Sequence, residues 1–523
     1  MKRAIKKAAA LLSVVAMCGT MFFNFPENSF VLSAFSADSG VAINEDNFPD
    51  EIFREYVKSF DTSGNNILSD EETAKVKSID VSERDITSLK GIEYFTELTS
   101  LMCSKNQITD LDVSNNSALM YLDCDTNQLS NLDLSNNTAL DTLYCNYNQL
   151  TSLDLSNNFA LTELFCGGNQ LTSLDVSNNP ALTSLGCVGN QLTSLDVSNN
   201  PDLTFLNCLS TQISSLDLSS NSALATLYCG LNQLTDLDLR NNTALTRLSC
   251  ENNQLTSLDL SNNSALTFID CGDNLLSSLD LSNNSVLKEL HCYNNKLTSL
   301  DISNNFALTH LFCNNNQLSS LDLSNNSALT YINCGDNLLS SLDVSNNSVL
   351  KGLYCYNNKL SSLDLSQNKD LAFLENLSNA YEISIDKDTY DLSELPGGFD
   401  VSKTSNWTNA TVNDNILTII DLSKPVTYDY DTGYTGDNTD YKKNTFTLNL
   451  KNTSALLGDV NGDGILNSVD ASAILTYYAI LMTEQTPTMK FDTSVADYNG
   501  DGIINAIDAS AILTYYANSM TSK

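Results

Sequence analysis

The sequence predicts a mainly β solenoid with a helical N-terminal cap, a β-rich C-terminal cap and a small helical calcium-loop domain after it. Thirteen cysteines from Cys103 to Cys355 recur at an interval of 21 residues, which indicates 13 coils of 21 residues. Near the C-terminus a loop-plus-helix segment occurs twice, beginning at Asp459 and at Asp497. The predicted units are a leader (1–37), a helical cap (38–85), the solenoid (86–376), a β-rich cap (377–455) and the calcium-loop domain (456–523).

The first residues predict an exported protein. A basic start, Met1 to Lys7, precedes an apolar stretch, Ala8 to Phe25, and small residues follow up to Ala37. This order is typical of a secretory signal peptide, and we expect cleavage after Ser36 or Ala37. No other stretch contains the eighteen apolar residues that a membrane span needs. The expected location is therefore extracellular, without a membrane span.

The segment before the repeats predicts a helical cap that covers the first coil. Residues 48–57 have helical periodicity, and the next segment has the spacing of a calcium loop in which Asn66 replaces the usual glycine. Asn tolerates the left-handed turn, so a calcium ion here is an open alternative to a purely structural loop. Its candidate ligands at loop positions 1, 3, 5, 7 and 12 are Asp61, Ser63, Asn65, Ile67 and Glu72.

Each repeat contains two Leu-rich halves. The first runs from Leu98 through Cys103 and Asn106 to Ile108, and the second is the segment 108–116 with Leu, Asp and Val at its centre. We expect each half to form a short strand, giving two short strands per coil and no helix. Over residues 86–376 the array resembles the leucine-rich repeats of bacterial secreted and surface proteins, with Cys in the third Leu position.

Two periodic polar and sulfur positions belong to the predicted interior. Asn116 recurs at every interval through Asn368, and stacked amides of this kind can hydrogen-bond buried turn backbone. The thirteen cysteines cannot all pair, and parallel side chains in neighbouring coils disfavour disulfides even at about 4.8 Å between Cα atoms. We therefore expect buried, reduced thiols.

The two outward surfaces of the solenoid differ. The second half repeats an aspartate from Asp112 to Asp364, which indicates a solvated acidic face, with cation binding as the alternative. The cysteine half varies and is rich in aromatic residues, which predict either a face that binds a glycan or protein, or rings that cover one another as cross-strand pairs. The candidate ligand-face residues are Tyr144, Phe165, Tyr228, Tyr293, Phe312, Tyr331 and Tyr354.

Part of the array is a recent internal duplication. The block Cys271 to Asp280 recurs at Cys334 to Asp343, and the four residues from Tyr293 recur from Tyr356. The two copies lie 63 residues, or three coils, apart. The number of coils is therefore adjustable, and no single coil is expected to hold a unique active site.

After the repeats, short apolar strands predict a β-rich C-terminal cap or small sandwich. Examples are residues 416–420 and 445–450, and the cap contains the single tryptophan, Trp407.

The duplicated C-terminal loops have calcium-ligand spacing. Oxygen donors at positions 1, 3, 5, 9 and 12, a backbone carbonyl at position 7 and glycine at position 6 suit a cation that prefers six to eight oxygens. The spacing predicts two calcium ions, one for each loop. The expected ligands are Asp459, Asn461, Asp463, Ile465, Asn467 and Asp470 in the first loop, and Asp497, Asn499, Asp501, Ile503, Asn505 and Asp508 in the second.

Each loop continues into the same helix, Ala-Ser-Ala-Ile-Leu-Thr-Tyr-Tyr, starting at Ala471 and at Ala509. With these loops, residues 457–520 resemble a type I dockerin, the module that attaches cellulosomal proteins to cohesins on a scaffold. The resemblance implies cohesin contacts at loop positions 10 and 11, which here are Ser468, Val469, Ala506 and Ile507.

The composition narrows the function classes. A net charge of −37 repels phosphate backbones, so a nucleic-acid partner is not expected. The only histidines are His291 and His310, without a nucleophile or metal motif beside them, so no catalytic residue is assigned. The prediction is a non-catalytic secreted recognition or adhesion protein on a cellulosome-type scaffold. The alternatives are a polysaccharide-degrading enzyme of the glycoside hydrolase type and a structural spacer.

Overall fold

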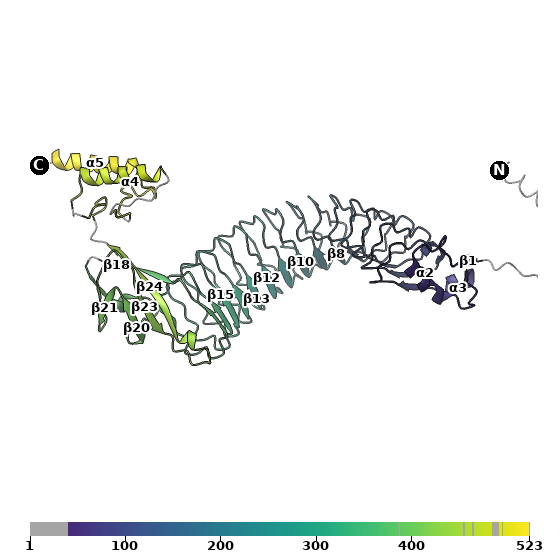
Figure 1. The fold of residues 1–523 in the computed structure, drawn as a ribbon, viewed down its shortest axis with the longest axis horizontal. Helices are drawn as coiled ribbons and strands as arrows, with labels where there is room; N and C mark the ends of the chain where they lie inside the picture. The colour runs from purple at the N-terminus through teal and green to yellow at the C-terminus, as the bar shows by residue number, and fades with distance from the viewer. Residues whose placement is uncertain are drawn as a thin grey trace, which may run out of the picture.

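The computed structural model describes residues 40–521 except 386, 453–455, 463–464, 484–490 and 494. The predicted leader, residues 1–37, lies outside the described residues. The repeat array forms an arch between a small N-terminal cap and a β-rich C-terminal cap, and two helices follow (Figure 1). The strands line the inner, concave side of the arch.

A single parallel sheet of 15 strands runs through the arch, and each strand has three residues. Strand residues pair at an interval of 22 between the first two strands and of 21 in the rest, as in Leu227 with Leu248, so identical positions of successive coils stack in register. Thirteen strands come from the cysteine-containing coils, and β3 and β17 flank them. The strands are β3 (Ser78–Asp80), β4 (Ser100–Met102), β5 (Tyr121–Asp123), β6 (Thr142–Tyr144), β7 (Glu163–Phe165), β8 (Ser184–Gly186), β9 (Phe205–Asn207), β10 (Thr226–Tyr228), β11 (Arg247–Ser249), β12 (Phe268–Asp270), β13 (Glu289–His291), β14 (His310–Phe312), β15 (Tyr331–Asn333), β16 (Gly352–Tyr354) and β17 (Phe373–Glu375).

The prediction of two strands per coil is wrong, because only the cysteine half forms a strand. In the other half the aspartate side chain accepts the backbone N–H two residues later, as Asp154 does from Ser156 at 2.9 Å. A turn follows at once, in which the Asn158 N–H donates to the Leu155 carbonyl. Local side-chain hydrogen bonds of this kind compete with a strand ladder, so this half is irregular backbone.

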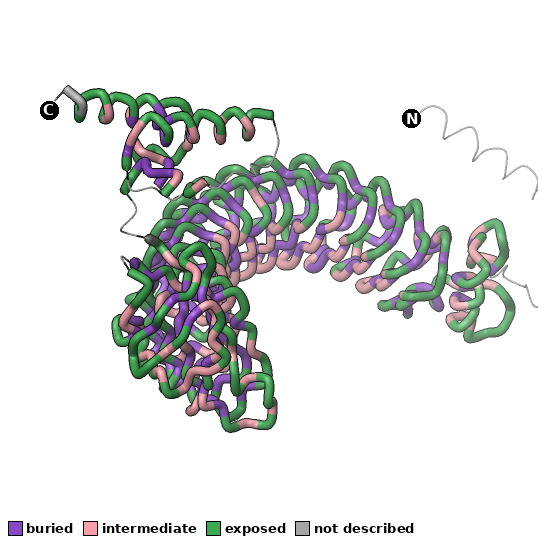
Figure 2. The backbone as a smooth tube through the Cα atoms, turned by 60° about the vertical axis from the view of Figure 1, so that its left-hand side comes forward, coloured by how far each residue is buried: buried purple, intermediate pink, exposed green. Residues whose placement is uncertain are grey.

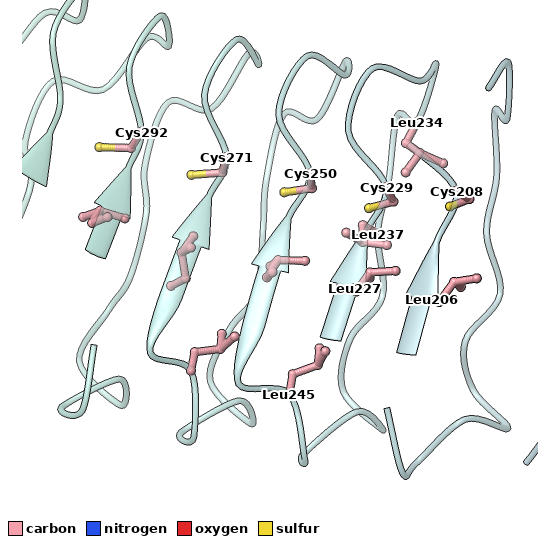
Figure 3. Close-up of a cluster of buried hydrophobic side chains, with 14 of the residues drawn as sticks. Leu206, Cys208, Leu227, Cys229, Leu234, Leu237, Leu245, Cys250, Cys271 and Cys292 are labelled. Carbon is pink, nitrogen blue, oxygen red and sulfur yellow. The ribbon is translucent and has the colours of Figure 1, made fainter. Parts of the chain in front are cut away.

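Leucine and cysteine side chains fill the interior of the solenoid. All thirteen cysteines of the array are free and fully buried. Figure 3 shows the sulfur atoms of Cys208, Cys229, Cys250, Cys271 and Cys292 in a row and pointing the same way, which is the parallel arrangement that disfavours disulfides. Burial raises the pKa of the Cys166 thiol from 9.0 to about 12. The prediction of buried thiols is confirmed.

Two asparagine ladders connect successive coils. In the first, Asn148 donates to the carbonyls of Cys124 and Cys145 at 3.0 and 3.3 Å and accepts the Leu129 N–H at 3.0 Å. In the second, Asn242 donates to the carbonyls of Leu218 and Asn221 at 3.1 and 2.9 Å. The predicted role of the stacked amides is confirmed, because these side chains satisfy turn carbonyls that water does not reach.

The N-terminal cap packs its aromatic residues against the first coils. It consists of a short sheet, two helices and two 3-10 turns whose buried Phe48 and Phe53 join the solenoid core. The hydroxyl of Tyr56 accepts the Asp80 N–H at 3.3 Å, at the open edge of β3. The elements are β1 (Gly40–Ala42), α2 (Glu51–Val57), η1 (Lys58–Phe60), β2 (Ile67–Ser69), α3 (Asp70–Lys75) and η2 (Ile92–Tyr94).

The C-terminal cap is β-rich, as predicted, and contains two sheets in the strand orders β18-β24-β23-β20 and β19-β22-β21. Its fully buried Tyr428 donates its hydroxyl to the Ser361 carbonyl at 2.6 Å, so one continuous core joins cap and solenoid. The elements are β18 (Ala380–Ile385), β19 (Thr389–Asp391), η3 (Leu392–Glu394), η4 (Val401–Lys403), β20 (Thr404–Thr408), β21 (Ala410–Asn413), β22 (Ile416–Ile419), β23 (Val426–Asp431), η5 (Thr439–Lys442) and β24 (Lys443–Asn452).

The two predicted C-terminal helices are α4 (Ser468–Leu481) and α5 (Ala506–Thr521). They pack together over a separate small core in which Ile474 and Ile512, at equivalent positions of the two copies, are fully buried. Across the described residues, every helix is too short or too polar to pass through a bilayer.

The burial pattern follows the coils. Purple buried backbone and green exposed backbone alternate once per coil along the arch (Figure 2). Half-buried backbone gathers on the inner side, where the outward residues of the strands lie.

Substitution of Asn242 tests the second asparagine ladder. We expect Asn242→Ala to lower the unfolding free energy by about 1–3 kcal/mol, because the buried carbonyls of Leu218 and Asn221 each lose one of their two donors. The neighbouring Asn241 is exposed and donates only to the Ser219 carbonyl, so Asn241→Ala is the matched control with a change below about 0.5 kcal/mol. Urea unfolding followed by circular dichroism measures both, and equal effects would contradict the ladder's role.

The thiols provide a test of the core packing. At pH 8 we expect the folded protein to resist Ellman's reagent, and all thirteen array thiols to react after denaturation, because the thiolate is the reactive form. The folded pKa of Cys166 lies above its ordinary value of 9.0. The stabilisation that the fold gains from the protonated Cys166 thiol is therefore complete below pH 9 and is lost as the pH rises towards 12. Rapid labelling of the native protein would contradict this packing.

Candidate functional site

The second C-terminal loop is held in a tight turn by its own carboxylates. Asp497 accepts the N–H groups of Asp501 and Gly502 at 3.1 and 2.7 Å. Asp508, which is fully buried, accepts those of Asn499 and Asn505 at 3.1 and 2.9 Å. Five of the six predicted ligands therefore take part in hydrogen bonds to the carboxylates at the first and last positions of the loop.

The first loop is also held by the carboxylates at its first and last positions. Asp459 accepts the Gly462 N–H at 2.9 Å, and the Oδ2 atom of the buried Asp470 accepts the Asn467 N–H at 2.9 Å. The Oδ1 atom of Asp470 is buried and has no hydrogen-bond partner among the described residues. A buried carboxylate oxygen without a partner destabilises the folded state unless a cation binds it. The predicted ligand Asp463, like Gly464, lies outside the described residues.

The donor set fits calcium. Each loop offers carboxylate and amide oxygens and the carbonyl at position 7, and calcium prefers hard oxygen ligands. The carbonyls of Ile465 and Ile503 accept the side-chain amides of Asn467 and Asn505 at 2.9 and 3.0 Å. Within the described residues, no three His, Cys, Asp or Glu side chains form a metal-holding group by themselves. The loops would therefore hold an ion through mixed carboxylate, amide and carbonyl donors.

The predicted cohesin-contact residues all lie at the surface at the start of α4 and α5. Val469 and Ile507 are 56% and 60% exposed, so the two copies present nearly the same apolar side chain. Ser468 and Ala506 are also exposed. The helices carry no Lys, Arg or Glu, and their only charged residues are the buried Asp470 and Asp508. The exposed surface of each helix is therefore uncharged.

The N-terminal loop closes through hydrogen bonds of its own. Asp61 accepts the N–H groups of Gly64 and Asn66, both at 2.7 Å. Glu72 accepts from the N–H groups of Thr62 and Ser69 and from both of their hydroxyls, at 2.8–3.0 Å. Calcium at the candidate ligands Asp61, Ser63, Asn65, Ile67 and Glu72 stays a prediction.

Most of the predicted ligand-face aromatics pack against one another on the strands. Tyr144 contacts Tyr121 and Phe165 with ring centroids 5.7 and 5.4 Å apart, and its hydroxyl donates to Glu163 at 2.6 Å. Further along, His310 stacks on Tyr331 at 5.2 Å. These edge-to-face and stacked contacts support the alternative that the rings cover one another as cross-strand pairs. The rings on the strands are half-buried on the concave side.

Unlike the other six candidate ligand-face residues, Tyr293 does not lie on a strand. Tyr144, Phe165, Tyr228, Phe312, Tyr331 and Tyr354 lie on strands. Tyr293 follows Cys292 and lies after the end of β13. The expectation that it stands on the strand face is therefore wrong, because strand geometry ends before the cysteine.

The two histidines occupy the concave face. Glu289 pairs with His310 in the register of β13 and β14. His291 instead has Asp270 as its carboxylate neighbour, with 3.3 Å between His291 Nδ1 and Asp270 Oδ2, and its ring lies between Phe268 and Phe312. Asp270 was not among the predicted neighbours of His291, although the two residues lie one repeat interval of 21 residues apart, which is a sufficient signal.

Comparison with known proteins identifies both parts of the chain. The type I dockerin domain family matches residues 457–515. Internalin J of Listeria monocytogenes is 38% identical over 71 residues, which are 13% of this chain and 8% of that protein's length. The chain therefore matches only a small part of that relative.

Solved structures match more of the chain. The functional domain of InlJ from Listeria monocytogenes, which includes a cysteine ladder, is 32% identical with a TM-score of 0.66 and covers 79% of this chain and 99% of its own. A leucine-rich repeat protein of Leptospira interrogans has a TM-score of 0.55 at 22% identity and covers 60% of this chain and 91% of its own. The second likeness concerns the fold alone.

Substitution of Glu72 distinguishes a structural carboxylate from a calcium ligand. We expect Glu72→Gln to lower the thermal stability of the N-terminal cap equally in calcium and in EGTA, because protein donors already surround this carboxylate. Glu71 is the matched control, since it is exposed and pairs only with Lys75 in its own helix. Differential scanning calorimetry measures both, and a loss of stability seen only in calcium would show instead that Glu72 binds the ion.

Proposed function

Because this chain belongs to the leucine-rich repeat family that includes InlJ and carries a type I dockerin domain, we propose that it is a secreted recognition protein anchored to a scaffold. The dockerin binds a cohesin in a calcium-dependent manner, and the scaffold is of the cellulosome type. The solenoid presents a concave face to a glycan or protein. The protein acts by binding and not by catalysis.

The observation that carries this proposal is the duplicated loop with its buried terminal carboxylate. Asp470 and Asp508 are both fully buried, and both close the loop onto the first turn of the following helix. The Oδ1 atom of Asp470, which has no hydrogen-bond partner among the described residues, supports a cation in the first loop. Calcium would fix the loops and thereby orient the two helix starts that carry the exposed Val469 and Ile507.

The solenoid supports the binding half of the proposal. Its concave surface is built from outward strand residues that differ from coil to coil, while the interior positions repeat. The histidine that has a carboxylate neighbour, His291, also contacts two phenylalanine rings, which is the environment of a packed surface residue. Export and attachment outside the cell are proposed from the predicted leader together with the dockerin domain.

Removal of calcium tests the anchoring. We expect chelation by EGTA, or the double substitution Asp459→Ala with Asp497→Ala, to abolish capture by immobilised cohesins of type I, because both loops lose their first ligand. Single substitutions measure how much each copy contributes. Surface plasmon resonance with the full-length protein gives the affinities.

The matched control is a pair of exposed carboxylates on the solenoid, Asp133→Ala with Asp154→Ala, which removes the same charge away from the dockerin. Capture by that variant should be unchanged. Capture that persists in EGTA would contradict calcium-dependent anchoring.

A further inference from the structure

Two tyrosines lie flat across glycines of the preceding coil, just after the strands. A Cβ atom added to Gly272 would lie 2.4–2.7 Å from three atoms at the hydroxyl end of the Tyr293 ring, and one added to Gly335 would lie 2.5–2.8 Å from the same atoms of Tyr356. Any larger residue would therefore displace the ring. Both tyrosines are half-buried, since one ring face rests on the glycine backbone.

Neither ring is engaged with another ring. The strand aromatics meet their neighbours edge to face, as Tyr144 does with Phe165. Among the described residues, the aromatic pairs include neither Tyr293 nor Tyr356. The negative face of such a ring attracts the C–H groups of an apolar or weakly polar ligand surface.

A carboxylate and amide pair flanks each tyrosine. The side-chain amide of Asn294 donates to Asp273 at 2.6 Å, and that of Asn357 donates to Asp336 at 2.7 Å. All four residues have φ between 50° and 51°, so the backbone of both copies has the same left-handed conformation at these positions. An aspartate and an asparagine together offer several acceptors and donors at the edge of a flat ring. Burial, with the nearby Asp270 carboxylate, raises the pKa of Tyr293 to about 12, so its hydroxyl remains a donor.

The internal duplication retains these clusters although the strand residues beside them have changed. The four outward strand positions of the two copies all differ: Phe268 and Tyr331, Asp270 and Asn333, Glu289 and Gly352, His291 and Tyr354. The glycine, aspartate, tyrosine and asparagine of the cluster are the same in both copies. The strand face has therefore diverged while the cluster has not.

We propose that Tyr293 over Gly272 and Tyr356 over Gly335 form two equivalent sugar-binding subsites for one neutral polysaccharide chain. Each tyrosine stacks on a sugar ring, and the flanking aspartate and asparagine hydrogen-bond its hydroxyls. The inference rests on the proposed function in assigning a ligand to the solenoid, and it selects a glycan rather than a protein. The paired aspartates and the net charge of −37 disfavour an anionic polysaccharide.

The spacing requires a polymer. Three coils separate the subsites, or about 14 Å at the usual distance between strands. This span exceeds one sugar ring, so only an extended chain reaches both tyrosines. Occupation of both subsites by one chain raises affinity through effective concentration, without a new contact.

The test measures binding of the full-length protein to soluble mixed-linkage β-glucan, xyloglucan and glucomannan, by affinity gel electrophoresis and calorimetry. We expect at least one of these neutral polymers to bind, and carboxymethyl cellulose to bind more weakly than its neutral counterparts. Tyr293→Ala or Tyr356→Ala should each weaken binding roughly threefold to tenfold, and the double variant by more than either. Gly272→Ala with Gly335→Ala should act in the same way, because the added methyl groups displace both rings.

Two controls make the outcomes separable. Tyr147→Ala removes a tyrosine that is 65% exposed on the same side of an earlier coil, and Phe312→Ala with Tyr331→Ala alters the strand face. Loss of polysaccharide binding only in the strand-face variant would overturn the two subsites and leave a glycan-binding solenoid. Absence of binding to every neutral polymer, with cohesin capture intact, would overturn the inference and leave a protein as the solenoid's ligand.

Discussion

Satisfaction of buried backbone by asparagine amides is the constraint on which the solenoid depends. Each coil turns sharply without a helix, and a buried turn carbonyl such as that of Val113 accepts one N–H of its own coil and keeps a second acceptor site to satisfy. The amide of Asn137 reaches the carbonyls of Val113 and Asn116 in the preceding coil, both at 3.0 Å. Within the part of the chain that the structure describes, the Oδ1 atoms of these asparagines have no hydrogen-bond partner. Each coil thus relies on its neighbour, which explains why the buried asparagines hardly vary while the surface does.

Positions that repeat in identical surroundings were predictable from the sequence. The cysteines, leucines and asparagines recur at one interval, and a single environment accounts for all copies. The second strand was not predictable, because Leu-Asp-Val has the composition of a strand and only the Asp side chain bonding to the Ser N–H reveals the turn. For the candidate site, loop spacing predicts calcium ligands between Asp459 and Asp508, and their binding of calcium stays a prediction. The flat placement of Tyr293 depends on a glycine 21 residues earlier, which a local pattern does not contain. The C-terminal cap depends on non-local pairing of β18 with β24.

A long parallel sheet has two open edges, and here a tyrosine hydroxyl lies at each. Tyr56 accepts the Asp80 N–H at the N-terminal edge, and Tyr441 accepts the Leu374 N–H at 3.1 Å at the other. Tyr441 also donates to the Ala372 carbonyl at 2.9 Å. Unpaired strand edges recruit other chains. The caps therefore limit edge-to-edge association of a solenoid whose interior would otherwise permit indefinite extension.

The direction of the sheet hydrogen bonds has a mechanical consequence. They connect one coil to the next and so lie along the length of the arch, as in the pairing of β10 with β11. A pull between the dockerin and the N-terminal cap would load these bonds along their length, and coils would open one after another from an end. Each released coil adds 21 residues, or roughly 70 Å of extended chain. The array would then lengthen under tension while its remaining coils stay folded.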